Sequence, residues 1–152
     1  MTGQVVHVLL VEDDEVDSEA IVRGFQKHSF ANPITIVTNG EDAVKVLRGE
    51  GAYDRIPAPY LILLDINMPR MNGLEFLKVL RQDPELRSSI VFVLTTSDSD
   101  RDKLAAYQEQ VAGYLLKQRS GTNFAELVRM LDSYWQVVEF PPEGRKWISA
   151  TT

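Results

Sequence analysis

Short apolar runs alternate along this chain with longer segments in which apolar residues recur every three or four positions. The runs cover residues 5–11, 33–37, 60–64, 90–94 and 113–116. Uninterrupted runs of this length predict strands that are buried on both faces of a sheet. The intervening segments, at about 15–28, 41–49, 74–82, 99–110 and 122–138, are predicted to be helices.

The first and last predicted helices have the clearest inner faces. In the first, we expect these apolar residues to face the core: Val16, Ala20, Ile21 and Phe25. Carboxylates near its start suit the helix macrodipole: Asp14, Glu15 and Asp17. In the last helix, Met130 and Val137 extend the apolar surface beyond a single stripe.

Five successive strand–helix units predict one α/β domain. Alternating strands and helices form a parallel sheet, and the helices of such a doubly wound sheet cover both of its faces. Asn39-Gly40 can signal a hairpin, but the helical periodicity that follows favours a turn into a helix. We expect the domain to span 5–138, with a tail over 139–152.

Composition narrows the classes of function. The formal net charge is −6 and the isoelectric point is about 4.9. An acidic chain is a poor general binder of nucleic acid or membrane surfaces, because both need an excess of Lys and Arg. The absence of cysteine excludes disulfides and thiolate chemistry, and no apolar run approaches the length of a membrane span. With no signal peptide at Met1–Gln4, we expect a cytoplasmic protein.

Polar residues with reactive side chains follow four of the five predicted strands. They are Glu12-Asp13, Asp65, Thr95 and Lys117. Because the carboxyl ends of parallel strands share one edge of the sheet, we expect these side chains to converge there. Carboxylates packed together repel one another, and a bound divalent cation would relieve that cost.

The residue types at this edge indicate phosphoryl transfer. Carboxylate ligands suit Mg²⁺ (or Mn²⁺), which keeps waters and phosphoryl oxygens as its other ligands. Lys117 could pair with an anion, and Thr95 could donate a hydrogen bond to one. Asp65 would then be a carboxylate nucleophile.

Several motifs resemble the response regulator receiver domain. They are Val-Glu-Asp-Asp at 11–14, Leu-Asp-Ile-Asn-Met-Pro at 64–69, Met-Asn-Gly at 71–73, Leu-Thr-Thr-Ser at 94–97 and Gly-Tyr-Leu-Leu-Lys at 113–117. The resemblance implies a flavodoxin-like (βα)5 fold. It also implies that Asp65 accepts a phosphoryl group from a histidine kinase.

The resemblance assigns further roles around Asp65. Asp13 and Asp65 would ligate Mg²⁺ through carboxylates, Glu12 through water, and Asn67 through its backbone carbonyl. Lys117 would contact a phosphoryl oxygen. The family's switch would consist of Thr95, which would hydrogen-bond the phosphoryl group, and Tyr114, which would rotate inward with it. The surface of the fourth helix, fifth strand and fifth helix would respond.

One residue departs from the family pattern. The family commonly has a cis proline after the lysine, whereas Gln118 follows Lys117 here. A non-proline cis bond costs about 2.5–4 kcal/mol, so the bond is expected to be trans, or else cis under strain.

A narrower resemblance is to the small, stand-alone response regulators of bacterial phytochromes. It implies a phytochrome-type kinase as partner, and a homodimer. Apolar residues of the last helix and the tail are the candidate dimer contacts: Met130, Tyr134, Val137 and Trp147.

Other hypotheses about the function stay open at this point. An aspartyl-phosphate hydrolase would want an acid where Asn67 stands, and a dinucleotide-binding enzyme would want glycines where Glu12-Asp13-Asp14 stands. A pseudo-receiver that only binds other proteins, or a receiver for a non-phytochrome kinase, fits the same motifs.

Overall fold

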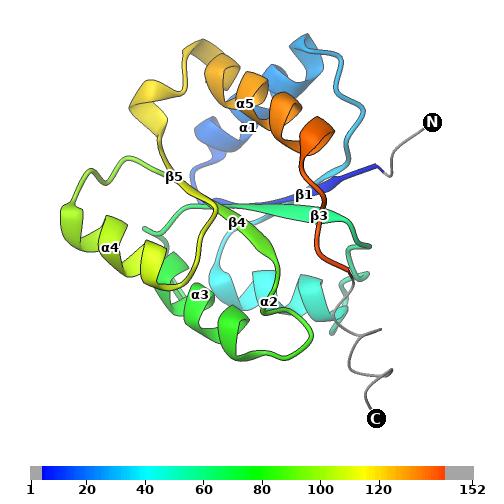
Figure 1. Cartoon of the computed structure of the whole chain (residues 1–152), viewed down its shortest axis with the longest axis vertical. Coiled ribbons are helices and arrows are strands. Elements are labelled where there is room, and N and C mark those ends of the chain that lie inside the picture. Colours follow the sequence, from blue (N-terminus) through cyan, green and yellow to red (C-terminus); the bar gives the residue numbers. More distant parts are fainter. Residues whose placement is uncertain (1–4, 143–152) are drawn as a thin grey trace.

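The computed structural model describes residues 5–142 and contains one parallel sheet. Its strands are β1 (His7–Val11), β2 (Ile34–Val37), β3 (Tyr60–Leu64), β4 (Ile90–Thr95) and β5 (Gly113–Leu116). They lie in the order β2-β1-β3-β4-β5, and each neighbouring pair is parallel. The predicted α/β fold with helices on both faces is therefore confirmed (Figure 1).

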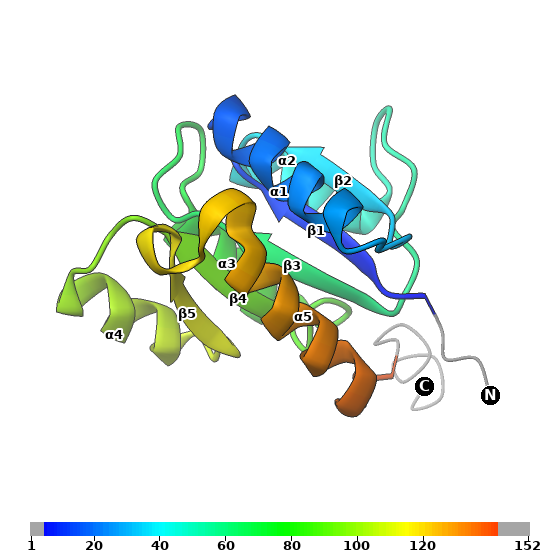
Figure 2. The ribbon, with the colours of Figure 1, turned by 90° about the horizontal axis from the view of Figure 1, so that it is seen from above.

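Two layers of helices enclose the sheet. The helices are α1 (Glu15–Lys27), α2 (Gly40–Arg48), α3 (Gly73–Gln82), α4 (Asp100–Gln108) and α5 (Ala125–Val137). Helices α1 and α5 cover one face side by side, while α2, α3 and α4 cover the other (Figures 1 and 2). Each face of the sheet buries its own apolar cluster, and β3 contributes to both, because its side chains alternate between the faces.

The first helix is rotated relative to the prediction. Ile21 and Phe25 are buried as expected, but Val16 is 72% exposed. The buried face runs back from Ile21 to Ser18 instead. One turn before Ile21 lie residues 17 and 18, so helical spacing brings these two toward the sheet and turns Val16 to solvent.

The last helix begins later than predicted. Residues Thr122–Phe124 form a 3-10 turn, and Asn123 and Phe124 have positive φ angles. Helix α5 then starts at Ala125 and ends at Val137. Beyond it, Phe140 folds back against Tyr134, with ring centroids 6.1 Å apart. Within residues 5–142 there is no helix that is long and apolar enough to cross a membrane.

Candidate functional site

The carboxyl ends of β1 and β3 place two acids side by side. Val11 and Leu64 are paired in the parallel ladder, so Glu12 and Asp65 follow at the same level. Backbone hydrogen bonds continue past the strands, since the amide of Asp65 donates to Val11 O at 3.0 Å and that of Glu12 to Val37 O at 2.9 Å. The sheet itself therefore fixes both positions.

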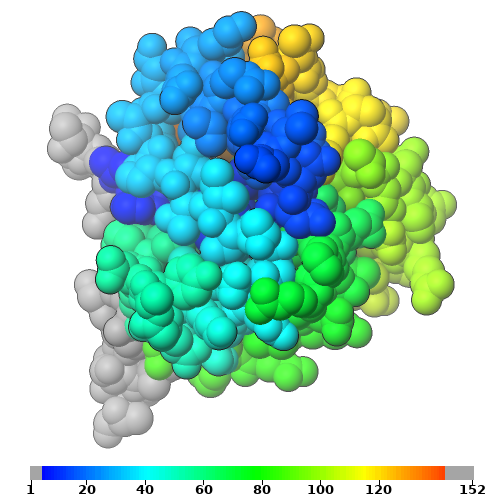
Figure 3. All heavy atoms as spheres, turned by 180° about the vertical axis from the view of Figure 1, so that it is seen from behind, coloured from blue at the N-terminus to red at the C-terminus, as the bar shows by residue number. Residues whose placement is uncertain are grey.

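Glu12, Asp13 and Asp65 form a compact acidic cluster. One oxygen from each carboxylate lies within 4.8 Å of the others. Glu12 is 1% exposed, whereas Asp13 faces solvent. In the space-filling view, the dark-blue start of α1 adjoins the green segment after β3 (Figure 3). Grouped carboxylate oxygens with one open side match the ligands that Mg²⁺ and Mn²⁺ prefer.

Lys117 supplies the positive charge at the centre of this cluster. Its Nζ lies 2.7 Å from Glu12 Oε1, 2.7 Å from Asp17 Oδ2 and 3.0 Å from Asp65 Oδ2. Burial alone would lower the pKa of Lys117, but hydrogen bonds to the three carboxylates outweigh it and raise the pKa above its usual range. The ammonium is therefore charged at neutral pH.

Within the cluster, the negative charge of Glu12 is poorly stabilised. Burial raises the pKa of its carboxyl to about 7, and the negative charge of Asp65 acts in the same direction. The hydrogen bond from Lys117 offsets only part of this rise. One ammonium does not balance all the surrounding carboxylates, and a divalent cation would favour the ionised form of Glu12.

The loop between β3 and α3 is built closely around Asp65. The amide of Asn67 donates to Asp65 Oδ1 at 3.0 Å. A Cβ atom on Gly73 would lie 2.6 Å from both Asp65 O and Ile66 Cα, so only glycine lets α3 begin this close to the strand end. Met71 has a φ of 65°. Its carbonyl accepts a hydrogen bond from the amide of Gly40 at 3.0 Å.

Thr95 and Tyr114 are linked through the loop after β4. Thr95 is fully buried, and its hydroxyl accepts a hydrogen bond from Ser97 N at 3.4 Å. The Tyr114 hydroxyl donates to Ser97 O at 2.9 Å. Ser97 also bonds Asp102 of α4 at 2.6 Å, so the loop connects the strand end to the first turn of that helix.

The bond after Lys117 is trans. Among residues 5–142, the cis peptide is Ala58-Pro59, and the chain leaves Lys117 in a 3-10 turn that ends at Arg119. The strained alternative for Lys117-Gln118 is therefore wrong. The Gln118 side chain bonds Thr96 O at 3.4 Å across the loop.

The candidate dimer contacts differ in their surroundings. Val137 is 83% exposed, and Met130 is half-buried beside a hollow between α4 and α5. Tyr134 packs edge-on against Phe92, with ring centroids 5.0 Å apart, so much of its ring is already used within the chain. Trp147 lies outside the described residues.

Asp17 is a site residue that the sequence did not predict. From the sequence it is one of several acids at the start of a helix, whereas in the structure its carboxylate lies against Lys117. Counting one turn back from Ile21 would have singled out residues 17 and 18. The expected convergence of Glu12, Asp13, Asp65 and Lys117 is found.

Known proteins are similar to this chain in sequence and in fold. Response regulator Rcp1 of Synechocystis sp. is 35% identical over 84% of this chain and 87% of its own length. The crystal structure of its Mn(2+)-bound form gives a TM-score of 0.79 at 34% identity, covering 90% of this chain and 99% of that one.

Two further solved structures agree. The phosphorylated cyanobacterial phytochrome response regulator RcpA gives a TM-score of 0.82 at 29% identity, over 91% of this chain and 100% of that one. Response regulator RPA3017, in red light signaling of R. palustris, gives a TM-score of 0.76 at 30% identity, over 91% of this chain and 99% of that one. The response regulator receiver domain family matches residues 8–131. The chain belongs to this family of two-component phosphorelay proteins and is homologous to phytochrome response regulators.

Proposed function

We propose that Asp65 is the phosphoacceptor of this receiver. The observation that carries the proposal is the contact between Asp65 and Lys117, 3.0 Å apart in a buried pocket of grouped carboxylates. A carboxylate at a strand end, held by the Asn67 amide and facing an ammonium, suits in-line attack on phosphorus.

The transfer exchanges one bond to phosphorus for another. An Asp65 oxygen forms the new P–O bond while the P–N bond of a kinase phosphohistidine breaks. The bonding pair leaves with the imidazole nitrogen. Lys117 contacts a phosphoryl oxygen, and the Thr95 hydroxyl donates a hydrogen bond to another.

Residues Asp13 and Asp65 would hold Mg²⁺ or Mn²⁺ through carboxylates, Glu12 through water and Asn67 through its carbonyl. Two features support this fit: the ligands are all oxygen atoms, and the pKa of Glu12 is raised for want of a compensating positive charge. When bound, the cation supplies positive charge that the pocket lacks. The relative Rcp1 has been crystallised in a Mn(2+)-bound form.

Switching would pass through Thr95 and Tyr114 to the surface of α4, β5 and α5. A phosphoryl group adds about −1.5 to −2 charge and strong acceptors at neutral pH. Drawing the Thr95 hydroxyl toward that group weakens its bond with Ser97, which also holds Tyr114 and Asp102. The Tyr114 ring could then turn inward.

The partner we propose is a phytochrome-type histidine kinase in the cytoplasm. Support comes from RcpA, described as a phytochrome response regulator, and RPA3017, described in red light signaling. We further propose a homodimer that uses Met130, Tyr134, Val137 and Trp147. The exposed Val137 supports a contact there, and the acidic net charge favours protein rather than nucleic acid partners.

Incubation with acetyl phosphate and Mg²⁺ tests the phosphoacceptor. Wild type should gain one acyl phosphate that hydroxylamine removes, while Asp65→Asn should stay folded and lose labelling by at least about 100-fold. An unlabelled wild-type protein would favour a pseudo-receiver that acts only by binding. Labelling of the Asn variant at the wild-type rate would place the acceptor elsewhere.

A further inference from the structure

Three carboxylates surround the ammonium of Lys117 within ion-pair distance. An ammonium has three N–H donors and no acceptor. Nζ donates to Asp17 at 2.7 Å and to Asp65 at 3.0 Å, and it forms an ion pair with Glu12 at 2.7 Å. Any new acceptor at this nitrogen therefore has to replace one of the three.

Asp17 differs from the other two acceptors. It lies on α1 rather than at a strand end, and it is not part of the compact cluster of Glu12, Asp13 and Asp65. Its side chain is 28% exposed, against 1% for Glu12 and 8% for Asp65. The first turn of α1 is itself fixed, because Asp14 caps the helix and accepts from Asp17 N at 3.1 Å.

We propose that Asp17 is a positioning residue for phosphoryl transfer, which tethers Lys117 so that its ammonium meets the phosphoryl group. This inference rests on the proposed function of Asp65. It assigns a role to a carboxylate outside the strand-end set, and the tether joins α1 to the end of β5.

The count of donors explains how the tether works. When Asp65 becomes bonded to phosphorus, its oxygen turns from a carboxylate into a weaker acyl acceptor. The N–H that pointed to Asp65 is released to a phosphoryl oxygen, while Asp17 keeps its hydrogen bond and Glu12 its ion pair. Lysine has a flexible four-carbon stem, and two fixed anchors avoid much of the entropy cost of placing it.

Replacing Asp17 tests the tether directly. Asp17→Ala removes the anchor but leaves Lys117 paired with Glu12 and Asp65, so the fold should survive. We expect the labelling rate at saturating acetyl phosphate and Mg²⁺ to fall by about tenfold, because the ammonium loses its fixed position. The Mg²⁺ dissociation constant, measured by calorimetry, should change by less than about twofold.

Two matched variants separate positioning from charge. Asp17→Asn keeps an acceptor oxygen at the same place and should retain labelling within about threefold of wild type. Glu19→Ala removes the same charge from an exposed site of α1 that has no ion pair among residues 5–142, and should label like wild type. The Lys117 side-chain NMR signals should broaden or shift in the Ala variant only.

The outcomes are distinguishable from failure of the proposed function. If wild type is not labelled at Asp65, the proposed function is wrong, and the proposed tether is wrong as well. If wild type is labelled and Asp17→Ala matches it, only the tether is wrong. A loss of Mg²⁺ affinity in proportion to the loss of rate would also overturn the tether, because Asp17 would then act through the cation.

Discussion

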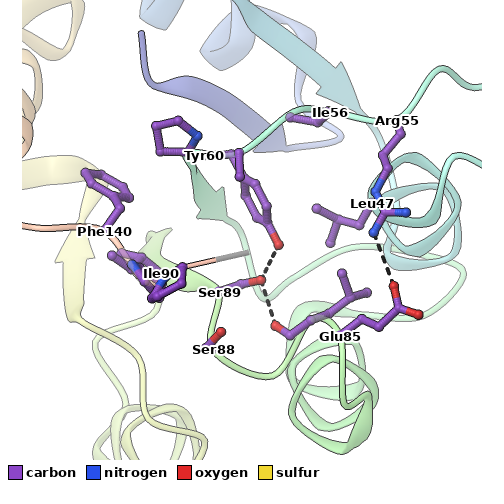
Figure 4. Close-up of a pocket in the computed structure, with 14 residues that line it drawn as sticks. Leu47, Arg55, Ile56, Tyr60, Glu85, Ser88, Ser89, Ile90 and Phe140 are labelled. Atoms are coloured by element: carbon purple, nitrogen blue, oxygen red, sulfur yellow. Dashed lines mark hydrogen bonds and ion pairs between the residues drawn. The ribbon is translucent and has the colours of Figure 1, made fainter. Parts of the chain in front are cut away.

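The two ends of the sheet are both polar, yet their polar groups are satisfied in different ways. At the amino end, Arg81 donates to four backbone carbonyls: Glu109 O at 2.7 Å, Arg87 O at 2.7 Å, Ser89 O at 2.8 Å and Gln110 O at 3.1 Å. There the Tyr60 and Ser89 hydroxyls also bond each other, beside the Arg55–Glu85 ion pair (Figure 4).

At the carboxyl end, the carboxylates outnumber the ammonium that they share. Glu12, Asp17 and Asp65 share one ammonium, and Asp13 adds a further negative charge. Burial keeps the pKa of Glu12 near 7 because its charge is poorly compensated. The difference teaches that polarity alone does not mark a site in this fold. An unbalanced excess of one charge does, because it can be relieved by a ligand.

The largest effect should come from replacing Arg81 at the amino end. Arg81→Met leaves four carbonyls without their shared donor and should lower the free energy of unfolding by about 4 kcal/mol, measured by urea denaturation. Arg87→Met, an exposed change nearby, should cost less than about 0.5 kcal/mol. Labelling of folded Arg81→Met should continue. Equal stability of the two variants would contradict a structural role for Arg81.

The next largest effect is a dependence of folding stability on pH, which arises at the carboxyl end of the sheet. The folded chain holds a proton on Glu12 up to about pH 7, whereas the unfolded chain loses it near its ordinary pKa of 4.5. Without divalent cations, wild-type stability should therefore fall relative to Glu12→Gln as pH rises from 4.5 to 7, by about 3 kcal/mol.

Saturating Mg²⁺ should flatten this slope, because the cation favours the ionised carboxylate. Parallel pH profiles of wild type and Glu12→Gln in the absence of cation would show that the carboxyl is not strained.

The smallest effect is a gain in stability. Asp13→Asn removes one like charge from the cluster and should raise the free energy of unfolding by about 0.5 kcal/mol at low salt, since solvent screens an exposed group. The same variant should bind Mg²⁺ at least about tenfold more weakly. If the variant were destabilised in cation-free buffer, this would contradict the idea that like charges repel one another at the carboxyl end.

Much of the fold could be predicted from the sequence because each strand is an apolar run that stops abruptly. Tyr60–Leu64 ends at Asp65, and Gly113–Leu116 ends at Lys117, so the strands and the position of the site follow together. The rotation of α1 was harder. Val16 and Ile21 are both apolar, and only packing against the sheet decides which of them is buried.

Contacts between distant segments could not be predicted in this way. No apolar or acidic pattern around Arg81 predicts its carbonyl partners. These partners come from loops 6 to 29 residues away in the sequence. The Asp17–Lys117 pair joins residues 100 positions apart. Such pairs depend on the final placement of helices on the sheet, which local sequence does not encode.

The central claim, that Asp65 takes the phosphoryl group, has a direct chemical test. After acetyl phosphate and Mg²⁺ treatment, borohydride reduces an aspartyl phosphate to homoserine, which mass spectrometry can map. Cleavage after Arg55 and Arg70 gives peptide 56–70, whose only carboxylate side chain is Asp65. Homoserine in that peptide is the predicted result. Homoserine in the amino-terminal peptide that contains Glu12, Asp13 and Asp17, with peptide 56–70 unchanged, would contradict the account.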